Sequence, residues 1–240
     1  MRSALIFLLV ATALAISIIE GAAYVASHRQ DFPWTELDLD APIGSATAGK
    51  LAALSDDTNR CRALLADVGD ADQPVPPLRS GPSCGYSNGM RLTPNSAGSI
   101  RFQPQGPVTS CPMAAALLLW ERDIVQPAAT RHFGQPVVRV VHAGSYSCRR
   151  LYGRSQGEFS EHASANAFDV LGFVLADGET VSVLRDWSSD ANRAAFLRDL
   201  RDGGCRLFAT VLSPDYNAAH ADHLHLDQAR RGVRGWSVCR

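Results

Sequence analysis

Two short segments, far apart in the chain, carry residues of the types that bind metal ions. The first contains His162 and Asp169, and the second, residues 220–225, has the sequence His-Ala-Asp-His-Leu-His. Four of the seven histidines of the chain fall in these two segments. Imidazole nitrogens and a carboxylate, in a three-ligand set with one open position, are the donors of a hydrolytic zinc site. We therefore predict one zinc centre that is assembled from both segments.

The spacing within each segment indicates how the side chains could meet. His223 and His225 are two residues apart, so in a β-strand both imidazoles would point to the same face. His162 and Asp169 are seven residues apart, which favours a turn that runs into a strand over one face of a helix. The small residues at 163–165 would let the backbone fold closely at this turn.

Both segments resemble the signatures of zinc peptidases. Residues 160–169, Ser-Glu-His-Ala-Ser-Ala-Asn-Ala-Phe-Asp, resemble the Ser-x-His-x-x-Gly-x-Ala-x-Asp signature of zinc D-Ala-D-Ala carboxypeptidases. Residues 220–225 resemble the His-x-x-His-x-His segment of penicillin-insensitive murein endopeptidases. Both groups belong to the superfamily of lysostaphin-type, D-Ala-D-Ala-type and hedgehog metallopeptidases. Ala165 stands where the carboxypeptidases have glycine, which restricts the backbone but removes no ligand.

Two further segments resemble the bacterial extensin-like C-terminal family. They are residues 144–149, Gly-Ser-Tyr-Ser-Cys-Arg, and residues 208–217, Phe-Ala-Thr-Val-Leu-Ser-Pro-Asp-Tyr-Asn. The resemblance extends roughly from Cys61 to the C-terminus. The family name is a historical label, because nothing here is proline-rich in the manner of a plant cell-wall extensin.

The resemblance implies a set of ligands and a neighbouring acid or base. By position, His162, Asp169 and His225 would be the zinc ligands. His223 would lie beside the metal without binding it, where it could stabilise the intermediate or move a proton. Such a zinc centre lowers the pKa of water and supports attack on an amide carbonyl.

Two residues are alternatives for the general base. Asp222 occupies the position of the carboxypeptidase glutamate, with a side chain one methylene shorter. His220 matches the first histidine of the endopeptidase pattern. We favour His220 together with His223, and interpret Asp222 as a carboxylate that holds a histidine tautomer.

Residues that could contact a substrate precede the first metal segment. Arg149 follows Tyr146 in a stretch that resembles the Tyr-Arg stretch of the carboxypeptidases, where an arginine meets the substrate carboxylate. A guanidinium group suits that contact because it can donate two parallel hydrogen bonds. Arg150 is adjacent and is an alternative. Ser160, which opens the carboxypeptidase-like signature, is a further candidate for substrate binding.

These observations predict an exported zinc metallopeptidase that hydrolyses amide bonds in peptidoglycan peptides, of the D,D-carboxypeptidase or endopeptidase type. The alternative is a non-catalytic zinc protein that binds peptidoglycan or serves as an envelope scaffold. A purely structural zinc would need a closed fourth position, which His223 or Asp222 would have to supply. The net charge of −1 gives no electrostatic case for nucleic acid as a partner.

The N-terminus has the pattern of a secretory signal or a signal-anchor. Arg2 precedes an uncharged apolar run over residues 4–19, followed by Glu20 and small residues. Residues 21–23 offer a plausible cleavage site, but we favour an uncleaved anchor. The remainder would then lie in a Gram-negative periplasm, tethered to the inner membrane, or be secreted if the segment is cleaved.

Cysteine usage agrees with export. The six cysteines are an even number, and exported proteins can hold disulfides, so we expect three bridges. Sequence alone does not choose among the pairings, but a Cys148–Cys205 bridge could brace the metal site. The candidates are Cys61, Cys84, Cys111, Cys148, Cys205 and Cys239.

The patterning predicts an α+β fold: an antiparallel β-sheet core with flanking helices, a zinc site on one sheet face and an N-terminal helical extension. We divide the chain into the export segment at 1–26, an extended linker at 27–46, a helical and turn-rich region at 47–110 and a metallopeptidase-like domain at 111–240. Helices are expected within 47–68, 112–133 and 190–201. Strands are expected at 136–141, 168–174, 180–184, 207–212 and 223–226, with an Asp177-Gly178 turn joining the second and third.

Overall fold

The structure, a computed structural model, describes residues 2–69, 73–93, 100–189, 191–230 and 237–240. Its α-helices are α1 (Arg2–Ser27), α2 (Thr47–Ala53), α3 (Thr58–Asp67), α4 (Cys111–Trp120), α5 (Gln126–Phe133), α6 (Val183–Asp186) and α7 (Ala191–Gly204). Its 3-10 and π segments are η1 (Arg29–Asp31), η2 (Leu54–Asp56), η3 (Glu121–Val125), η4 (Leu151–Gly153), η5 (Glu161–Ser164) and η6 (Ala218–His220). Its strands are β1 (Gln73–Pro74), β2 (Leu78–Arg79), β3 (Gly85–Tyr86), β4 (Gly89–Arg91), β5 (Arg101–Gln103), β6 (Val108–Ser110), β7 (Val137–Gly144), β8 (Ala167–Leu175), β9 (Thr180–Ser182), β10 (Thr210–Leu212), β11 (Leu224–Asp227) and β12 (Val238–Cys239).

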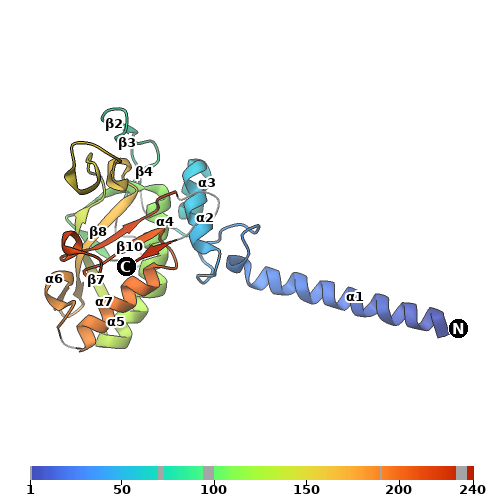
Figure 1. The fold of residues 1–240 in the computed structure, drawn as a ribbon. Helices are drawn as coiled ribbons and strands as arrows, with labels where there is room; N and C mark the ends of the chain where they lie inside the picture. Colours follow the sequence, from blue (N-terminus) through green and yellow to red (C-terminus); the bar gives the residue numbers. More distant parts are fainter. Residues whose placement is uncertain (1, 70–72, 94–99, 190, 231–236) are drawn as a thin grey trace.

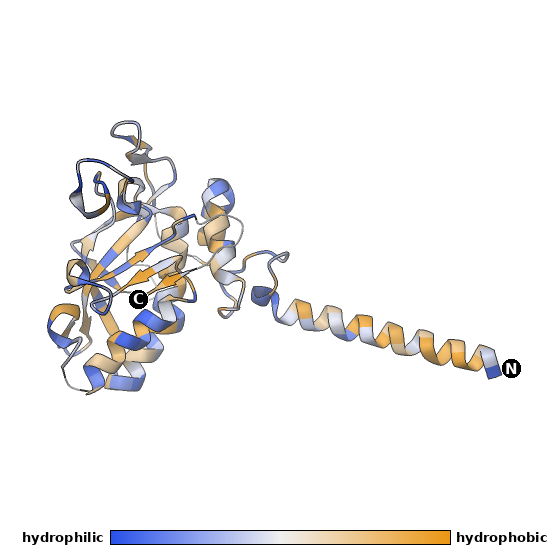
Figure 2. Cartoon of the chain, viewed as in Figure 1, coloured by the Kyte–Doolittle hydropathy of each residue, from blue (hydrophilic) through white to orange (hydrophobic). Residues whose placement is uncertain are grey.

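The apolar N-terminal run forms a single helix, α1, that extends away from the rest of the chain (Figure 1). Hydrophobic residues make up most of its length, as the colouring in Figure 2 shows, and none of its residues is buried. It is the one helix in the described ranges that is long and apolar enough to cross a membrane. This observation supports a secretory signal or a membrane anchor at the N-terminus.

The segment that follows α1 packs against the domain, whereas the sequence analysis predicted an extended linker over residues 27–46. Leu37 and Leu39 are buried in the main hydrophobic core. Lys50 donates a hydrogen bond from Nζ to the carbonyl oxygen of Arg29 at 2.7 Å, so the start of the segment is fixed as well. The two leucines explain the difference, because burying their apolar surface stabilises the packed arrangement.

The main sheet has seven strands in the order β12-β10-β11-β8-β7-β5, with β9 paired to β8. The inner pairs are antiparallel, as expected. Both edges differ from the expectation, because β12 runs parallel to β10 and β5 runs parallel to β7. Helices and a largely antiparallel sheet thus share one domain, which confirms the α+β class.

One long helical run supplies much of the layer beside the sheet. The helix expected over 112–133 is α4, η3 and α5 in direct succession, with a π turn between the two α-helical parts. It starts at Ser110, whose hydroxyl accepts a hydrogen bond from the backbone N–H of Met113. Helix α7 packs beside α5 and η3, and the three cover one face of the sheet (Figure 1).

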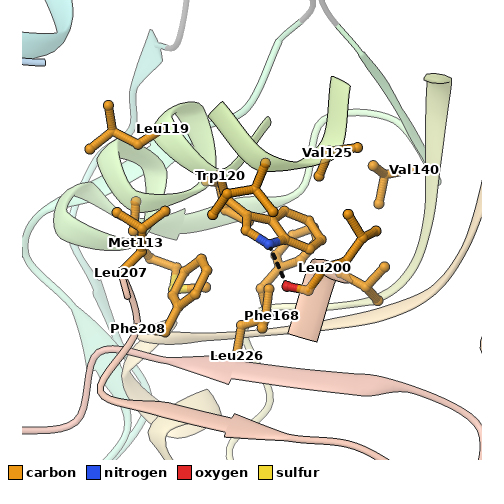
Figure 3. Packing of buried hydrophobic residues seen from close by; sticks show 14 of the residues in the cluster. Met113, Leu119, Trp120, Val125, Val140, Phe168, Leu200, Leu207, Phe208 and Leu226 are labelled. Carbon is orange, nitrogen blue, oxygen red and sulfur yellow. Dashed lines mark hydrogen bonds between the residues drawn. The ribbon is translucent and has the colours of Figure 1, made fainter. Parts of the chain in front are cut away.

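Trp120 lies at the centre of the core between these helices and the sheet (Figure 3). Its ring centroid is 5.9 Å from that of Phe173 on β8 and 6.3 Å from that of Phe208. Its indole N–H donates a hydrogen bond of 3.0 Å to the carbonyl oxygen of Leu200 on α7. These contacts tie the helices to the sheet, whose strands β8 and β11 carry two of the predicted metal ligands.

A β-bulge decides which way the side chains of β8 point. The pairing of β7 with β8 skips Leu171, which is the extra residue of the bulge. Strict alternation would put Phe168 and Phe173 on opposite faces, yet both are fully buried members of the same core cluster. Asp169, next to Phe168, consequently projects from the other face of the sheet.

Several predicted boundaries shift by a few residues. The strand expected at 207–212 is shorter, because the N–H groups of Leu207 and Phe208 still bond to the carbonyl oxygen of Gly204 at the end of α7. His223 lies just before β11 and outside the strand. Residues 183–186 form α6 and do not continue β9. Position 190, the expected start of α7, lies outside the described residues.

Three disulfides join distant parts of the chain, as the even cysteine count predicted. The bridges are Cys61–Cys111, Cys84–Cys148 and Cys205–Cys239. The suggested Cys148–Cys205 bridge is wrong: Cys148 is tied to the β2–β3 hairpin and Cys205 to the C-terminal strand. Together with α1, the disulfides support export from the cytoplasm.

Candidate metal centre

Three side chains from the two predicted segments converge on the face of the sheet opposite the helices. His162 is in η5, Asp169 is on β8 and His225 is on β11, and each offers one donor atom within 4.8 Å of the others. The antiparallel pairing of β8 with β11 places Asp169 directly opposite His225. All three side chains are largely buried, with exposed fractions of 3 %, 9 % and 12 % in that order.

The turn that carries His162 is fixed by its ends. Ser160 caps η5, since its hydroxyl accepts a hydrogen bond from the N–H of His162. Ala165 ends the turn in the left-handed region, with φ of 56°, which is the conformation that glycine adopts most readily. The Ala165 carbonyl oxygen accepts bonds from the N–H of Ser110 and the hydroxyls of Thr109 and Ser145. These three donors hold the strained residue in place.

Hydrogen bonds behind the cluster orient both imidazoles. His162 Nδ1 lies 2.7 Å from the carbonyl oxygen of Ser145, which can only accept, so this nitrogen carries the hydrogen and Nε2 faces the centre. His225 Nε2 lies 3.1 Å from Asp227 Oδ2, and its Nδ1 faces the centre. Carboxylate or carbonyl partners of this kind fix the tautomer of a metal-binding histidine.

The distances between the inward donor atoms suit a tetrahedral ion. His162 Nε2 lies 3.1 Å from Asp169 Oδ2 and 3.3 Å from His225 Nδ1, and the distance from His225 Nδ1 to Asp169 Oδ1 is 2.9 Å. Donors about 2.0–2.1 Å from a tetrahedral zinc lie about 3.3 Å from one another. Two imidazoles and one carboxylate, at these separations, therefore fit zinc with a fourth position left over.

Without a metal, the cluster holds a proton. Burial opposes ionisation of Asp169, but hydrogen bonds from His162 and His225 outweigh it and lower the pKa of Asp169 well below its usual range. Burial also disfavours the charged form of His225, yet the hydrogen bonds to Asp169 and Asp227 raise its pKa to about 9. A metal ion would have to displace the proton from His225 in order to bind there.

The histidines proposed for proton transfer lie beside the cluster. His223 Nε2 is 3.6 Å from Asp169 Oδ1, and His223 Nδ1 is 2.8 Å from Asp222 Oδ1. The ring centroid of His220 is 5.1 Å from that of His223 and 5.9 Å from that of His225. Burial and the neighbouring charges of His223 and His225 lower the pKa of His220 to about 4, which leaves this ring neutral at pH 7.

Arg149 approaches the cluster and Arg150 does not. Arg149 Nη2 is 3.7 Å from Asp169 Oδ2, and about half of the Arg149 side chain is exposed. Arg150 instead lies over the ring of Phe159, 4.2 Å from its centroid, and donates to the carbonyl oxygen of Gly157. Of the two alternatives from the sequence, Arg149 is the one whose guanidinium lies next to the cluster, and its contact with a substrate stays a prediction.

The other two predicted contact residues, Tyr146 and Ser160, make contacts within the fold. The ring of Tyr146 packs edge-to-face against Tyr86 of β3, with centroids 5.6 Å apart, and its hydroxyl oxygen is buried without a hydrogen-bond partner in the described parts of the chain. Ser160 caps η5, as described above. Substrate contacts by Tyr146 and Ser160 stay predictions.

Sequence reasoning missed the groups that orient the imidazoles. Asp227 could have been found, because it is two residues beyond His225 in the same strand and therefore on the same face. The carbonyl oxygen of Ser145 left no signal, since any residue type offers the same backbone group. Asn217, which bonds to His220 at 2.8 Å, was also missed.

The fold and the cluster together define an α+β domain with a buried His–Asp–His centre of the metal-ligand type on one face of its sheet. The chain belongs to the family described as extensin-like protein C-terminus, whose model matches residues 59–240. The match spans the domain from α3 to the last strand and includes both metal-site segments. No curated protein and no solved structure matched the chain.

Proposed function

We propose that this protein is an exported zinc metallopeptidase that hydrolyses amide bonds in peptidoglycan peptides. The observation that carries the proposal is the convergence of His162, Asp169 and His225, whose donor atoms lie within 4.8 Å of one another. Their type, spacing and orientation suit a zinc ion with three protein ligands. The resemblance of both segments to zinc carboxypeptidases and murein endopeptidases supports the same assignment.

A catalytic centre is favoured over a purely structural one by what lies next to the three donors. A structural zinc needs a fourth protein ligand, and the nearest further candidates are Asp222 and His223. The Asp222 carboxylate is 58 % exposed and bonds to His223 Nδ1 at 2.8 Å, so these two side chains pair with each other. His223 Nε2 lies 3.6 Å from Asp169 Oδ1 but is not among the three donor atoms that lie within 4.8 Å of one another, and we infer that the fourth position is open for water or a substrate.

The chain's own residues can supply the remaining functions of an amide hydrolase. When bound, zinc would polarise the scissile carbonyl and lower the pKa of a water molecule. His220, neutral at pH 7, would accept a proton. His223, oriented by Asp222, would donate to the leaving amine or to the carbonyl oxygen as it gains negative charge. Arg149 would pair with a substrate carboxylate.

The substrate class follows from the compartment and the family resemblance. The α1 helix and three disulfides support a location outside the cytoplasm, and we place the domain in the periplasm, tethered to the inner membrane by α1. Peptidoglycan peptides are found there and carry both amide bonds and terminal carboxylates. A guanidinium beside the metal centre suits such a carboxylate.

The proposal is tested with the full chain in detergent, loaded with zinc and incubated with purified peptidoglycan. Released muropeptides are read by mass spectrometry and bound zinc by elemental analysis. His162→Ala should lose both zinc and products. His132→Ala is the matched control, because His132 pairs with Asp199 away from the centre, and it should retain both.

Two other outcomes would decide against the proposal. One equivalent of zinc without any product would contradict a hydrolase and favour the zinc-containing peptidoglycan-binding or scaffold protein. Failure of the wild-type chain to bind zinc would contradict the metal centre itself. The masses of the products would also separate carboxypeptidase from endopeptidase cleavage, since only the former releases a terminal amino acid.

A further inference from the structure

Asn217 occupies the loop before β11 and uses every polar atom of its side-chain amide. Its Oδ1 lies 3.0 Å from the backbone nitrogen of Ala219 and 2.8 Å from His220 Nδ1. Its Nδ2 lies 3.5 Å from the hydroxyl oxygen of Tyr152, which belongs to a different loop. The amide therefore connects a residue beside the metal centre to a second loop at its rim.

These contacts determine which nitrogen of His220 carries the hydrogen. A backbone N–H can only donate, so the atom that faces Ala219 must be the amide oxygen of Asn217. The same oxygen faces His220 Nδ1, which must then be the donor. A neutral imidazole carries one ring hydrogen, and here it is on Nδ1. Nε2 is left as the acceptor and has no hydrogen-bond partner among the residues that the structure describes.

We propose that Asn217 is a positioning residue, whose amide oxygen holds His220 as the Nδ1–H tautomer and so presents Nε2 as the proton acceptor. This inference rests on the proposed function in assigning proton transfer to His220, but the tautomer itself can be measured without any activity. The ring is enclosed on its other sides by Tyr216, His223 and His225, whose ring centroids are 5.5, 5.1 and 5.9 Å away.

Tyr152 adds a reason why the amide keeps its orientation. Its hydroxyl oxygen accepts a hydrogen bond from Asn217 Nδ2, and turning the amide over would instead place the amide N–H groups against the backbone N–H of Ala219, two donors facing each other. Tyr152 has φ of 56°, a conformation that non-glycine residues rarely adopt, and 56 % of it is exposed. A strained, exposed tyrosine at the rim of a buried cluster is the kind of feature that accompanies functional sites.

The plainer interpretation is that Asn217 only caps the short helix η6, through Ala219 N. The chain offers a direct comparison, because Ser160 caps η5 through the N–H of the second following residue in the same way. A serine hydroxyl is therefore sufficient for this kind of cap, whereas the additional contact to His220 requires the longer side chain of Asn217. Replacement by serine separates the two roles.

The test compares Asn217→Ser, which keeps a capping oxygen but is too short to reach His220, with Asn217→Asp, which keeps both contacts. The metal-free full chain, labelled with 15N at histidine, is studied in detergent by long-range 1H–15N NMR at pH 7. His220→Gln assigns the signals. We expect the Nδ1–H tautomer in the wild type and in Asn217→Asp, and the Nε2–H tautomer as the main form in Asn217→Ser.

Either of two NMR results would overturn the inference. One is a wild-type protein in which His220 carries its hydrogen on Nε2. The other is an Asn217→Ser variant that keeps the Nδ1–H tautomer, which would leave Asn217 as a cap only.

Turnover of peptidoglycan gives a second readout. In Asn217→Ser we expect kcat to fall about tenfold to a hundredfold with KM unchanged, and Asn217→Asp to restore most of it, because general-base catalysis by one group contributes about a hundredfold or more. A fall in kcat that Asn217→Asp does not rescue would contradict the positioning role. If the wild type itself has no activity, the proposed function fails, while the tautomer measurement still decides the role of Asn217.

Discussion

His225 and Asp169 lie directly opposite each other on neighbouring antiparallel strands, and His225 Nδ1 approaches Asp169 Oδ1 to 2.9 Å. The two residues are 56 positions apart in the sequence. Their meeting depends on the register of β8 against β11, because a shift by one residue would turn one of them to the opposite face. The strand register therefore brings together two of the three residues of the candidate metal centre.

Zinc binding is expected to release about one proton from the protein at pH 7. Burial disfavours the charged form of His225, but the hydrogen bonds to Asp169 and Asp227 raise the pKa of His225 to about 9. The metal must therefore displace a proton from this ring. Calorimetric titrations in buffers of different ionisation enthalpy measure the number released. Asp227→Asn should lower this number by lowering the pKa of His225. A binding enthalpy that is the same in all buffers would contradict the prediction.

The metal-free protein is expected to lose stability as the pH rises from 6.5 to above 9. The pKa of His225 is higher in the folded state than its ordinary value of 6.5. The protonated ring therefore contributes its full share to the free energy of unfolding below pH 6.5, and this contribution is lost as the pH rises through about 9. The loss should amount to roughly 2–4 kcal/mol, since one pKa unit corresponds to about 1.4 kcal/mol. Urea unfolding of the EDTA-treated protein measures it. His225→Gln should show a flatter profile over the same range.

Arg149→Ala is expected to raise KM sharply for a pentapeptide with a free terminal carboxylate. We expect KM to rise about tenfold to a hundredfold, which corresponds to the loss of a charge-assisted hydrogen bond of about 1.5–3 kcal/mol. Arg150→Ala is the control, because its guanidinium lies over Phe159 and should contribute little to KM. Steady-state kinetics on the synthetic peptide measure both. An unchanged KM in Arg149→Ala would rule out recognition of the carboxylate by this residue.

Removing the Cys84–Cys148 bridge is expected to affect both stability and substrate binding. The bridge closes a separation of 64 residues and ends one position before Arg149. Replacing both cysteines with serine should lower the free energy of unfolding by about 2–4 kcal/mol and raise KM. The matched control replaces Cys205 and Cys239, which should lower stability and leave KM unchanged. Equal effects on KM in both variants would show that the first bridge has no special role in placing Arg149.

Ala165→Gly and Ala163→Gly are expected to change stability in different ways. Ala165 is in the left-handed region, where a non-glycine residue costs about 1–2 kcal/mol, so glycine should be neutral or stabilising by up to about 1 kcal/mol. Ala163 lies within η5 and is also buried, and glycine there should destabilise by about 1 kcal/mol. Chemical unfolding of the two variants gives the comparison. The same loss in both would mean that the Ala165 backbone carries no strain.

Much of the domain could be predicted because its signals are local. The apolar run that forms α1, the helical region from 112 to 133 and the Asp177-Gly178 hairpin each depend on neighbours within one or two turns of the chain. The export segment and the three disulfides followed from composition. The resemblance set Ala165 at a glycine position without predicting its conformation, and the structure places it in the left-handed region.

Features that depend on long-range packing were missed or wrong. The segment after α1 was expected to be extended, but Leu37 and Leu39 pack into a hydrophobic core formed by residues far along the chain. The suggested Cys148–Cys205 pairing failed for the same reason, because proximity in space depends on how loops pack over the sheet. The bulge at Leu171 could not be recognised from the alternation of polar and apolar residues, because the residues on both sides of it are apolar.

The sequence by itself determined the types of the candidate metal-binding side chains, their order and the local turn and strands that carry them. Tertiary structure alone decided how these side chains and the neighbouring His220 are oriented, through the bulge that turns Asp169 away from the helices, the carbonyl oxygen of Ser145 behind His162, and the contact of Asn217 with His220. The physical reason is that residue type and spacing encode chemistry and local conformation. Hydrogen-bond partners and strand register are selected only when the whole domain buries its apolar surface together.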